Sequence, residues 1–229
     1  THDRVLIDAT SGNTGIGYAM IGAAKGYAVR LVMPANVTQE RKALAKAYGA
    51  TIVESDPLEG SDGAIRLARQ IVADEPEGYF YPDQYNNDSN WRAHYDTTGP
   101  EILCQTNGRV THFVAGLGTT GTLMGVGRYF AQEKPDVQII AAEPRYGDLV
   151  YGLRNIDEGF VPELFDSAVL TSRYSVGAAD AVRRMRELLE VEGIFAGVST
   201  GAILHAALGV ARKAERDGRA ADIALVVCD

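Results

Sequence analysis

The sequence predicts an α/β protein of two lobes, each built around a doubly wound, mostly parallel sheet. Short apolar runs alternate with longer segments of helical periodicity along the 229 residues. Most of the apolar runs are continuous, which is typical of parallel strands covered on both faces. Two turns rich in glycine and threonine each follow such a run and open a helical pattern. In doubly wound folds ligands bind at the carboxyl ends of the strands, which is where both turns lie.

The first lobe covers residues 1–88 in this prediction. Its strands are expected at residues 5–7, 29–33, 51–53 and 79–81, which are short apolar runs. Its helices are expected at 16–25, 39–48 and 62–73, where apolar residues recur at helical spacing. Gly26 and Gly49 follow two of these helices. Glycine is common there because it adopts the left-handed conformation without steric cost.

The second lobe covers residues 89–229. Its strands are expected at 112–115, 138–142 and 223–227. Its helices are expected at 91–103, 123–132, 177–190 and 202–216, with Gly193 as a C-terminal cap of the third. Residues 145–175 form the least regular stretch and are rich in Tyr, Asp and Gly. A long irregular segment in a compact domain is more often a functional loop than filler.

Composition indicates an ordinary enzyme domain, with 46% hydrophobic and 23% charged residues. The net charge of −8 argues against a partner that is a nucleic acid or an anionic membrane. No apolar run approaches the length of a membrane span, and no signal-peptide pattern is present. The two cysteines and four scattered histidines lack metal-ligand spacing, so we expect no metal site. The sparse cysteines indicate a reducing compartment, and we expect a cytoplasmic protein.

The first of the two turns is the stretch Thr10–Gly15, with the sequence TSGNTG. The first N–H groups of a helix lack intrahelical partners and lie at the positive end of its dipole. Together with hydroxyl groups, they can bind a carboxylate or a phosphate. The simpler interpretation is that Thr10 or Ser11 caps the helix and Gly12 relieves a tight turn. Six small polar residues exceed what a cap requires, which favours an anion site.

The second turn spans residues 116–122, with the sequence GLGTTGT. Gly116, Gly118 and Gly121 match the dinucleotide fingerprint G-x-G-x-x-G, and Glu143 ends the next strand. A nicotinamide-dependent dehydrogenase is therefore one alternative. Thr119, Thr120 and Thr122 change the chemistry of this turn. Hydroxyl and N–H groups together suit the many acceptor oxygens of a terminal phosphate monoester, which we expect here.

Five stretches together resemble the cysteine synthases, which are fold-type II pyridoxal-phosphate enzymes with a tryptophan synthase β-like fold. They are TSGNTG at 10–15, QYNN at 84–87, TGPE at 98–101, GTTGT at 118–122 and GVSTG at 197–201. They occur in the order seen in that family and span essentially the whole chain. Each motif alone is weak, but the combination is specific. The resemblance implies a β-replacement reaction, in which a sulfur nucleophile displaces the leaving group of an O-activated L-serine to give L-cysteine.

The resemblance also implies site residues. The substrate carboxylate would be held by Thr10, Ser11, Asn13 and Thr14, with help from Gln84; Asn13 would also reach the ring hydroxyl of the cofactor. The phosphate of pyridoxal 5'-phosphate would be held by Gly118, Thr119, Thr120, Gly121 and Thr122. Ser199 would meet the pyridine nitrogen, where a neutral hydroxyl suits elimination and replacement better than transamination. Without the resemblance, Ser199 would be a plain helix N-cap before Gly201 and Ala202.

One departure concerns the Schiff-base lysine, which in this family lies a few dozen residues before the TSGNTG loop. Nine residues precede Thr10, and none of them is lysine. The lysines of the chain are Lys25, Lys42, Lys46, Lys134 and Lys213. All lie in polar or helix-surface patterns, so we expect none of them to carry the cofactor. We expect the lysine outside this sequence, which would leave these residues without the covalent anchor and the α-proton base.

A second departure concerns the substrate. Residues 151–160 read YGLRNIDEGF, and in acetylserine-using enzymes the position matching Arg154 is typically neutral. A guanidinium at the mouth of the active site would bind a dianionic leaving group through paired hydrogen bonds. The segment resembles the branch that uses O-phosphoserine, so we expect O-phospho-L-serine, with O-acetyl-L-serine as the alternative. The simpler interpretation is a surface salt bridge from Arg154 to Asp157 or Glu158.

Other functions stay open at this point. They are a cystathionine β-synthase, the nicotinamide-dependent dehydrogenase, and a lysine-less paralogue that binds a ligand or partner without turnover. For a cysteine synthase, the expected partners are the amino-acid substrate and a sulfur donor. The donor could be sulfide, thiosulfate or a protein-borne thiocarboxylate. A homodimer is expected because the family is usually dimeric.

Overall fold

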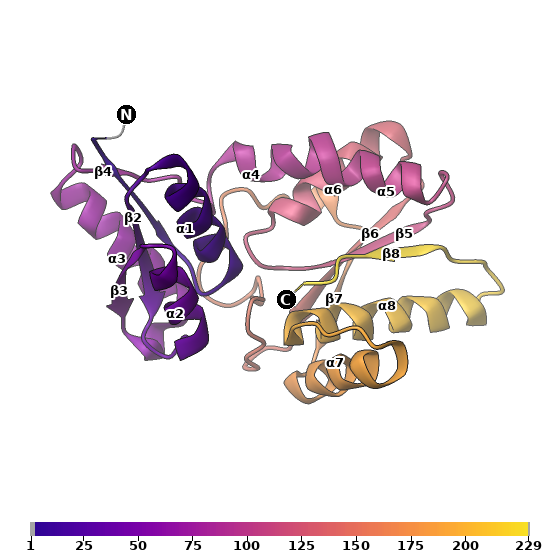
Figure 1. Cartoon of the computed structure of the whole chain (residues 1–229). Coiled ribbons are helices and arrows are strands. Elements are labelled where there is room, and N and C mark those ends of the chain that lie inside the picture. Colours follow the sequence, from indigo (N-terminus) through magenta and orange to yellow (C-terminus); the bar gives the residue numbers. More distant parts are fainter. Residues whose placement is uncertain (1–2, 229) are drawn as a thin grey trace. The chain divides into compact units, whose positions relative to one another are not determined.

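The computed structural model describes residues 3–228. It divides into two compact units, Thr1–Gln84 and Tyr85–Asp229 (Figure 1). The division falls close to the lobe boundary expected between residues 88 and 89. In the described residues, no helix combines the length and the apolar character that crossing a membrane requires.

The first unit contains a four-stranded parallel sheet with the order β3-β2-β1-β4. The strands are β1 (Val5–Ala9), β2 (Val29–Pro34), β3 (Thr51–Ser55) and β4 (Tyr79–Phe80). The helices are α1 (Asn13–Lys25), α2 (Gln39–Ala47) and α3 (Gly60–Asp74), with a 3-10 turn η1 (Pro57–Glu59) before α3. Helix α1 lies close to the sheet at Gly22, where a Cβ atom would be 2.5 Å from the Val29 side chain. The helix ends at Gly26, which adopts the predicted left-handed conformation with φ +75°.

The second unit contains a four-stranded parallel sheet with the order β7-β6-β5-β8. The strands are β5 (His112–Gly116), β6 (Gln138–Pro144), β7 (Ser172–Val176) and β8 (Ile223–Leu225). The helices are α4 (Asp88–Ala93), α5 (Gly99–Gln105), α6 (Gly121–Glu133), α7 (Ala178–Glu192) and α8 (Val198–Arg216). A π-helical turn η2 (His94–Thr98) joins α4 to α5, and a 3-10 turn η3 (Ser167–Val169) precedes β7.

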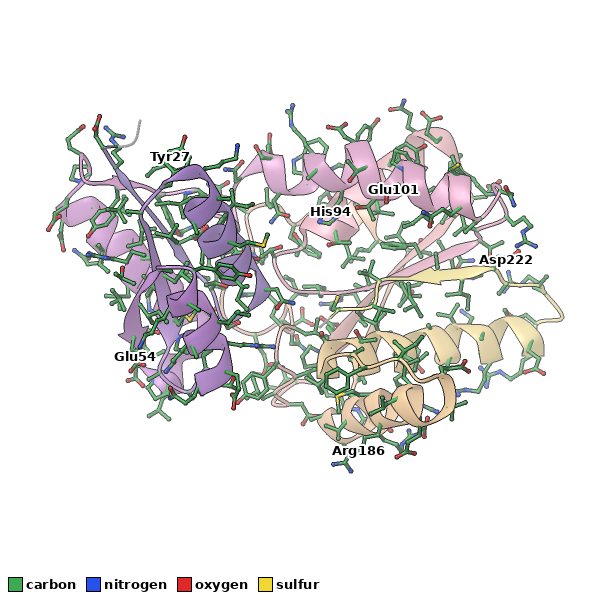
Figure 2. The ribbon with its side chains drawn as sticks, in the orientation of Figure 1. Tyr27, Glu54, His94, Glu101, Arg186 and Asp222 are labelled. Carbon is green, nitrogen blue, oxygen red and sulfur yellow. The ribbon has the colours of Figure 1, made fainter. Side chains whose placement is uncertain are left out.

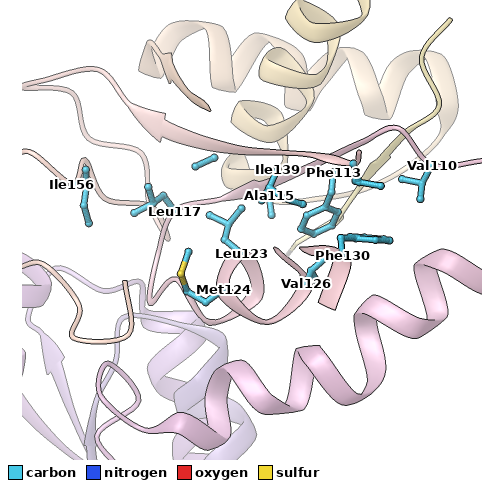
Figure 3. Packing of buried hydrophobic residues seen from close by; sticks show 12 residues of the cluster. Val110, Phe113, Ala115, Leu117, Leu123, Met124, Val126, Phe130, Ile139 and Ile156 are labelled. Atoms are coloured by element: carbon cyan, nitrogen blue, oxygen red, sulfur yellow. The ribbon is translucent and has the colours of Figure 1, made fainter. Parts of the chain in front are cut away.

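Both faces of this second sheet are covered, as its continuous apolar strands predict. Phe113 and Ala115 of β5 belong to one buried cluster, together with Leu123 and Phe130 of α6 (Figure 3). Val114 of the same strand belongs to a second cluster, together with Ile203 of α8. Successive residues of β5 therefore point to opposite faces, and each face is apolar.

Two elements differ from the expectation. The single helix expected at 91–103 is split into α4, η2 and α5. Pro100 lies in the first turn of α5 and has no N–H group, so the regular helical hydrogen bonds cannot continue through it. Strand β7 lies in the stretch expected to be irregular. It is an edge strand with mostly exposed residues, so it lacks the apolar run that marks the other strands.

Candidate functional site

The turn Gly118–Thr122 leaves the sheet after β5 and opens the 13-residue helix α6. Thr120 is buried and has a left-handed φ of +75°, an uncommon conformation for a β-branched residue. Its Oγ1 atom is buried and has no partner within residues 3–228. In the same described range, the main-chain amides of Gly118, Thr119 and Thr120 donate no hydrogen bond. Unpaired donors gathered at a helix N-terminus form a site suited to an anion.

Residues of α4 and η2 support this turn from the side. Asn90 Nδ2 donates to Thr119 Oγ1 at 3.2 Å, and that oxygen also accepts from the Gly121 amide at 3.4 Å. Thr122 Oγ1 is 3.2 Å from Nε2 of His94, which comes from η2 (Figure 2). Burial lowers the pKa of His94, because it disfavours the charged form of the ring. Thr119 and Thr122 are thus held by protein groups, whereas the Thr120 hydroxyl is left for a ligand.

Sequence reasoning missed Asn90 and His94. Asn90 lies in the polar run QYNNDSN, where nothing distinguishes it from the other asparagines. His94 is one of four scattered histidines, and only the π-helical turn brings it against α6.

Ser199 is joined to the same turn through Gly152. Ser199 is buried in the first turn of α8, whose N-cap is Gly197, so the plain N-cap interpretation of Ser199 is wrong. Gly152 has a φ of +86°, and a Cβ atom there would lie 3.8 Å from Ser199 Oγ. The Gly152 carbonyl oxygen would lie 3.0 Å from a Cβ atom on Gly118. The second unit therefore brings the phosphate-type turn and Ser199 together on either side of Gly152.

In the first unit, the Thr10 hydroxyl supports the TSGNTG turn itself. Its Oγ1 accepts from the amides of Gly12 at 3.2 Å and Gly15 at 3.3 Å. The N-cap residue of α1 is Gly12, so the buried Thr10 supports the turn without being its cap. Ser11 is half-buried, whereas Asn13 and Thr14 are exposed in the first turn of α1. The structure therefore separates a supporting residue from residues that face solvent.

A buried carboxyl group, Asp8, lies directly behind this turn. It accepts from the amide of Ala9 at 2.8 Å, the hydroxyl of Tyr18 at 3.1 Å and the amide of Gln84 at 3.2 Å. Gln84 Nε2 in turn donates to the Ala9 carbonyl at 2.6 Å, which brings Gln84 beside the turn. Burial raises the pKa of Asp8 to about 7. Sequence reasoning missed Asp8, although a charged residue inside the run VLIDA was a signal for it.

Arg154 is anchored at both its backbone and its side chain. Its amide donates to the Leu117 carbonyl at 2.8 Å, directly before the phosphate-type turn. Its guanidinium donates to the Phe160 carbonyl at 2.5 Å and lies 5.1 Å from the ring centre of Tyr85. Within residues 3–228, Asp157 and Glu158, the two partners that the simpler interpretation names, are bonded to other groups. Asp157 instead pairs with Arg173 at 2.9 Å, and Glu158 accepts from the Gly147 amide at 2.8 Å.

Comparison with known proteins assigns the family. The family described as "Pyridoxal-phosphate dependent enzyme" matches residues 1–229. The chain belongs to this family. A cysteine synthase of Aquifex aeolicus is 48% identical over 227 residues, which cover 99% of this chain and 69% of the relative. Cysteine synthase B of Escherichia coli is 44% identical over 225 residues, which cover 98% of this chain and 72% of the relative.

Solved structures agree with this family and with the predicted fold. O-acetyl serine sulfhydrylase isoform 3 from Entamoeba histolytica has a TM-score of 0.87 at 34% identity, covering 99% of this chain and 69% of that one. A hydrogen sulfide-producing enzyme from Fusobacterium nucleatum has a TM-score of 0.92 at 33% identity, covering 100% and 79%. The prediction of a fold-type II pyridoxal-phosphate enzyme related to cysteine synthases is thereby confirmed.

The site of this pyridoxal-phosphate enzyme fits the cofactor. The orphaned Thr120 hydroxyl and the unpaired amides of Gly118 to Thr120 would hold its phosphate, and Ser199 would hold its ring. When bound, the cofactor acts as an electron sink for the substrate carbanion. The dinucleotide interpretation of Gly116, Gly118 and Gly121 is wrong. Glu143, which it required for a ribose, is buried and is already bound to the Ile156 amide and to Arg173.

One expectation for the lysines of the enzyme needs correction. Lys42 does not lie on a helix surface, because it is 3% exposed within the first unit. Its Nζ donates to the Ala35 carbonyl at 2.7 Å and pairs with Glu54 at 2.6 Å, which offsets the cost of burying the charge. Lys42 therefore ties α2 to β3 and has a structural role.

Proposed function

We propose that the enzyme is a cysteine synthase that uses O-phospho-L-serine and replaces its phosphate with a sulfur nucleophile. The reaction class is supported by the cysteine synthases that are 48% and 44% identical to this chain. The choice of phosphoserine over acetylserine depends on one observation, the anchored guanidinium of Arg154. The sulfur donor, whether sulfide, thiosulfate or a protein-borne thiocarboxylate, and a homodimeric assembly belong to the same proposal.

Arg154 has the properties of a residue that binds a phosphate. Its backbone is bonded to Leu117, the residue before the cofactor-phosphate turn. Its side chain is half-buried, with Tyr85 and Phe160 rings 5.1 Å and 5.7 Å from the guanidinium carbon. The two rings also pack edge to face on each other, and together they restrict the rotamers of this long side chain, so less entropy is lost when a ligand binds. A planar guanidinium fork matches the oxygens of a phosphate and is stronger where water is partly excluded.

The first unit would bind the amino-acid part of the substrate. We assign its carboxylate to the N-terminus of α1, where Ser11, Asn13 and Thr14 present short polar side chains at the positive end of the helix dipole. Thr10 and Gln84 contribute by holding this turn through bonds to Gly12, Gly15 and the Ala9 carbonyl. These assignments come from the resemblance of the TSGNTG stretch to the cysteine synthases, and the exposure of Asn13 and Thr14 supports them.

Arg154→Ala in the cofactor-loaded enzyme tests the substrate assignment. A charge-assisted pair lost in a partly desolvated site is worth about 2–4 kcal/mol, so kcat/KM for phosphoserine should fall about thirty- to thousandfold. Turnover of acetylserine, whose leaving group is uncharged, should change far less. Arg154→Lys should restore phosphoserine use only in part, because an ammonium keeps the charge but not the planar fork.

The matched control is Arg30→Ala. Arg30 also lies against an aromatic ring, with its guanidinium carbon 5.4 Å from the ring centre of Tyr79, but it belongs to β2 of the first unit. Its replacement should leave the ratio of the two kcat/KM values unchanged. If Arg154→Ala lowers kcat/KM for both substrates by the same factor, Arg154 is structural and the phosphoserine assignment fails.

A further inference from the structure

The segment that carries Arg154 has no regular secondary structure, yet it is bonded to the ends of two neighbouring strands. The Arg154 amide donates to the Leu117 carbonyl after β5 at 2.8 Å. The buried Asn155 donates through Nδ2 to the Pro144 carbonyl at the end of β6 at 2.9 Å. Ile156 follows and is buried in the same cluster as Leu117 (Figure 3). Consecutive residues are therefore held by separate contacts, which leaves the backbone at Arg154 little freedom.

A buried carboxylate adds a further bond. Glu143 lies in β6, and its side chain is 3% exposed. Its Oε2 accepts from the Ile156 amide at 3.3 Å and lies 3.5 Å from Arg173 Nη1. Burial raises the pKa of Glu143, and these two donors oppose that shift. Burying a carboxyl group costs free energy unless it is hydrogen-bonded or paired, and Glu143 has one partner of each kind.

Arg173 connects this buried carboxylate to the outside of the same segment. It comes from the edge strand β7, and its Nη2 pairs with Asp157 Oδ2 at 2.9 Å. The Asp157 amide also donates to Asn155 Oδ1 at 2.8 Å, so Asp157 is part of the turn that follows Arg154. One guanidinium thus bridges a strand carboxylate and a loop carboxylate. We refer to Glu143, Arg173 and Asp157 as the bridge.

We propose that Glu143 and Arg173 are positioning residues for substrate selectivity, because the bridge holds the Arg154 segment where its guanidinium meets the phosphate of O-phosphoserine. This inference rests on the proposed function. Paired hydrogen bonds to a phosphate depend steeply on geometry, and a displacement of about 1 Å can cost up to a hundredfold in rate. Selectivity for phosphoserine is therefore shared between the residue that contacts the substrate and two residues behind it.

Arg173→Gln in the cofactor-loaded enzyme is the first test. It removes both ion pairs of the bridge from a half-exposed position, where substitution is tolerated. KM for phosphoserine should rise about tenfold, while kcat stays within about twofold and kcat/KM for acetylserine is nearly unchanged. Amide hydrogen exchange at residues 155–157 should become faster, with no change in β5. Arg173→Lys should restore selectivity in part, since it keeps the charge but cannot bridge two carboxylates in the same geometry.

Glu143→Gln is the second variant. The amide oxygen of glutamine can still accept from Ile156, so the variant removes the charge while keeping one hydrogen bond. It should show the same selective rise in KM as Arg173→Gln. The matched control is Arg183→Gln, because Arg183 also bridges two carboxylates, Asp180 at 2.6 Å and Glu187 at 3.0 Å, but on α7. The control should leave KM for both substrates unchanged.

The outcomes separate this inference from the proposed function. Suppose that Arg154→Ala lowers kcat/KM for phosphoserine alone, but Arg173→Gln changes KM for both substrates equally or for neither. The positioning role is then overturned and the phosphoserine assignment stands. If Arg154→Ala itself is unselective, the phosphoserine assignment fails and the positioning role fails with it. Faster exchange at 155–157 without a change in selectivity would show that the bridge serves stability alone.

Discussion

Asn90 and Gly121 lie so close that a Cβ atom on Gly121 would be 1.9 Å from the Asn90 side-chain oxygen. The other end of the same amide donates to Thr119 Oγ1 at 3.2 Å. A single asparagine of α4 therefore occupies the space that a side chain at position 121 would need, and it orients the hydroxyl two residues earlier. The glycine is required by this neighbour, because its own backbone does not adopt a left-handed conformation.

Gly121→Ala should therefore weaken binding of pyridoxal 5'-phosphate. The new methyl group must displace Asn90, which releases Thr119 and disturbs the unpaired amides. Each lost hydrogen bond to a charged group costs roughly 1.5–3 kcal/mol, so the amount of cofactor that stays bound after dialysis should drop at least tenfold. The control is Gly17→Ala in α1, where a Cβ atom meets nothing within 4 Å. That variant should keep the cofactor and gain up to about 1 kcal/mol of stability. Normal cofactor content in Gly121→Ala would contradict the phosphate role of this turn.

Thr10→Ala should mainly lower stability, whereas Asn13→Ala should mainly weaken substrate binding. Thr10 is buried and accepts two turn amides, so its loss should lower the free energy of unfolding by about 1–2 kcal/mol. Asn13 is exposed, so its loss should change stability by less than about 0.5 kcal/mol but raise KM for the amino-acid substrate. Urea unfolding and steady-state kinetics on both variants make the comparison. An Asn13→Ala enzyme with an unaltered KM would remove Asn13 from the carboxylate site.

Asp8 should make stability depend on pH. An unfolded aspartate titrates near 4, whereas burial raises the pKa of Asp8 to about 7 in the folded protein. The folded state therefore binds more protons between these values. Its free energy of unfolding should fall as pH rises from about 4 to 7, by at most about 4 kcal/mol. This contribution is fully present below pH 4 and is lost above pH 7.

The comparison of wild type with Asp8→Asn isolates this contribution. Asparagine mimics the protonated acid in having no charge, so the variant should be most destabilised relative to wild type at about pH 4 and below, and least near pH 8. Urea unfolding at several pH values measures the difference, with Asp74→Asn, an exposed position, as the control. A difference that does not vary with pH would show that Asp8 keeps its ordinary pKa.

The local pattern was sufficient for most strands and for locating the two turns between a strand and a helix. Strand β5 reads as a continuous apolar run because both of its faces are buried, and GTTGT and TSGNTG stand out because they follow such runs. Strand β7 could not be predicted in this way. Its stability comes from pairing with β6 at an edge, and pairing with a distant partner leaves no periodic trace in five mostly exposed residues.

The sequence by itself determined the family, the parallel α/β architecture and the candidates for cofactor and substrate contacts, because apolar periodicity and glycine-rich turns are local properties. Only the tertiary structure decided what each candidate does. It made Thr10 a support and left the Thr120 hydroxyl without a partner among residues 3–228. It also placed the buried carboxylates Asp8 and Glu143 behind the turn and behind the Arg154 segment. Burial and hydrogen-bond partners arise from segments far apart in the chain, and no window of neighbouring residues contains them.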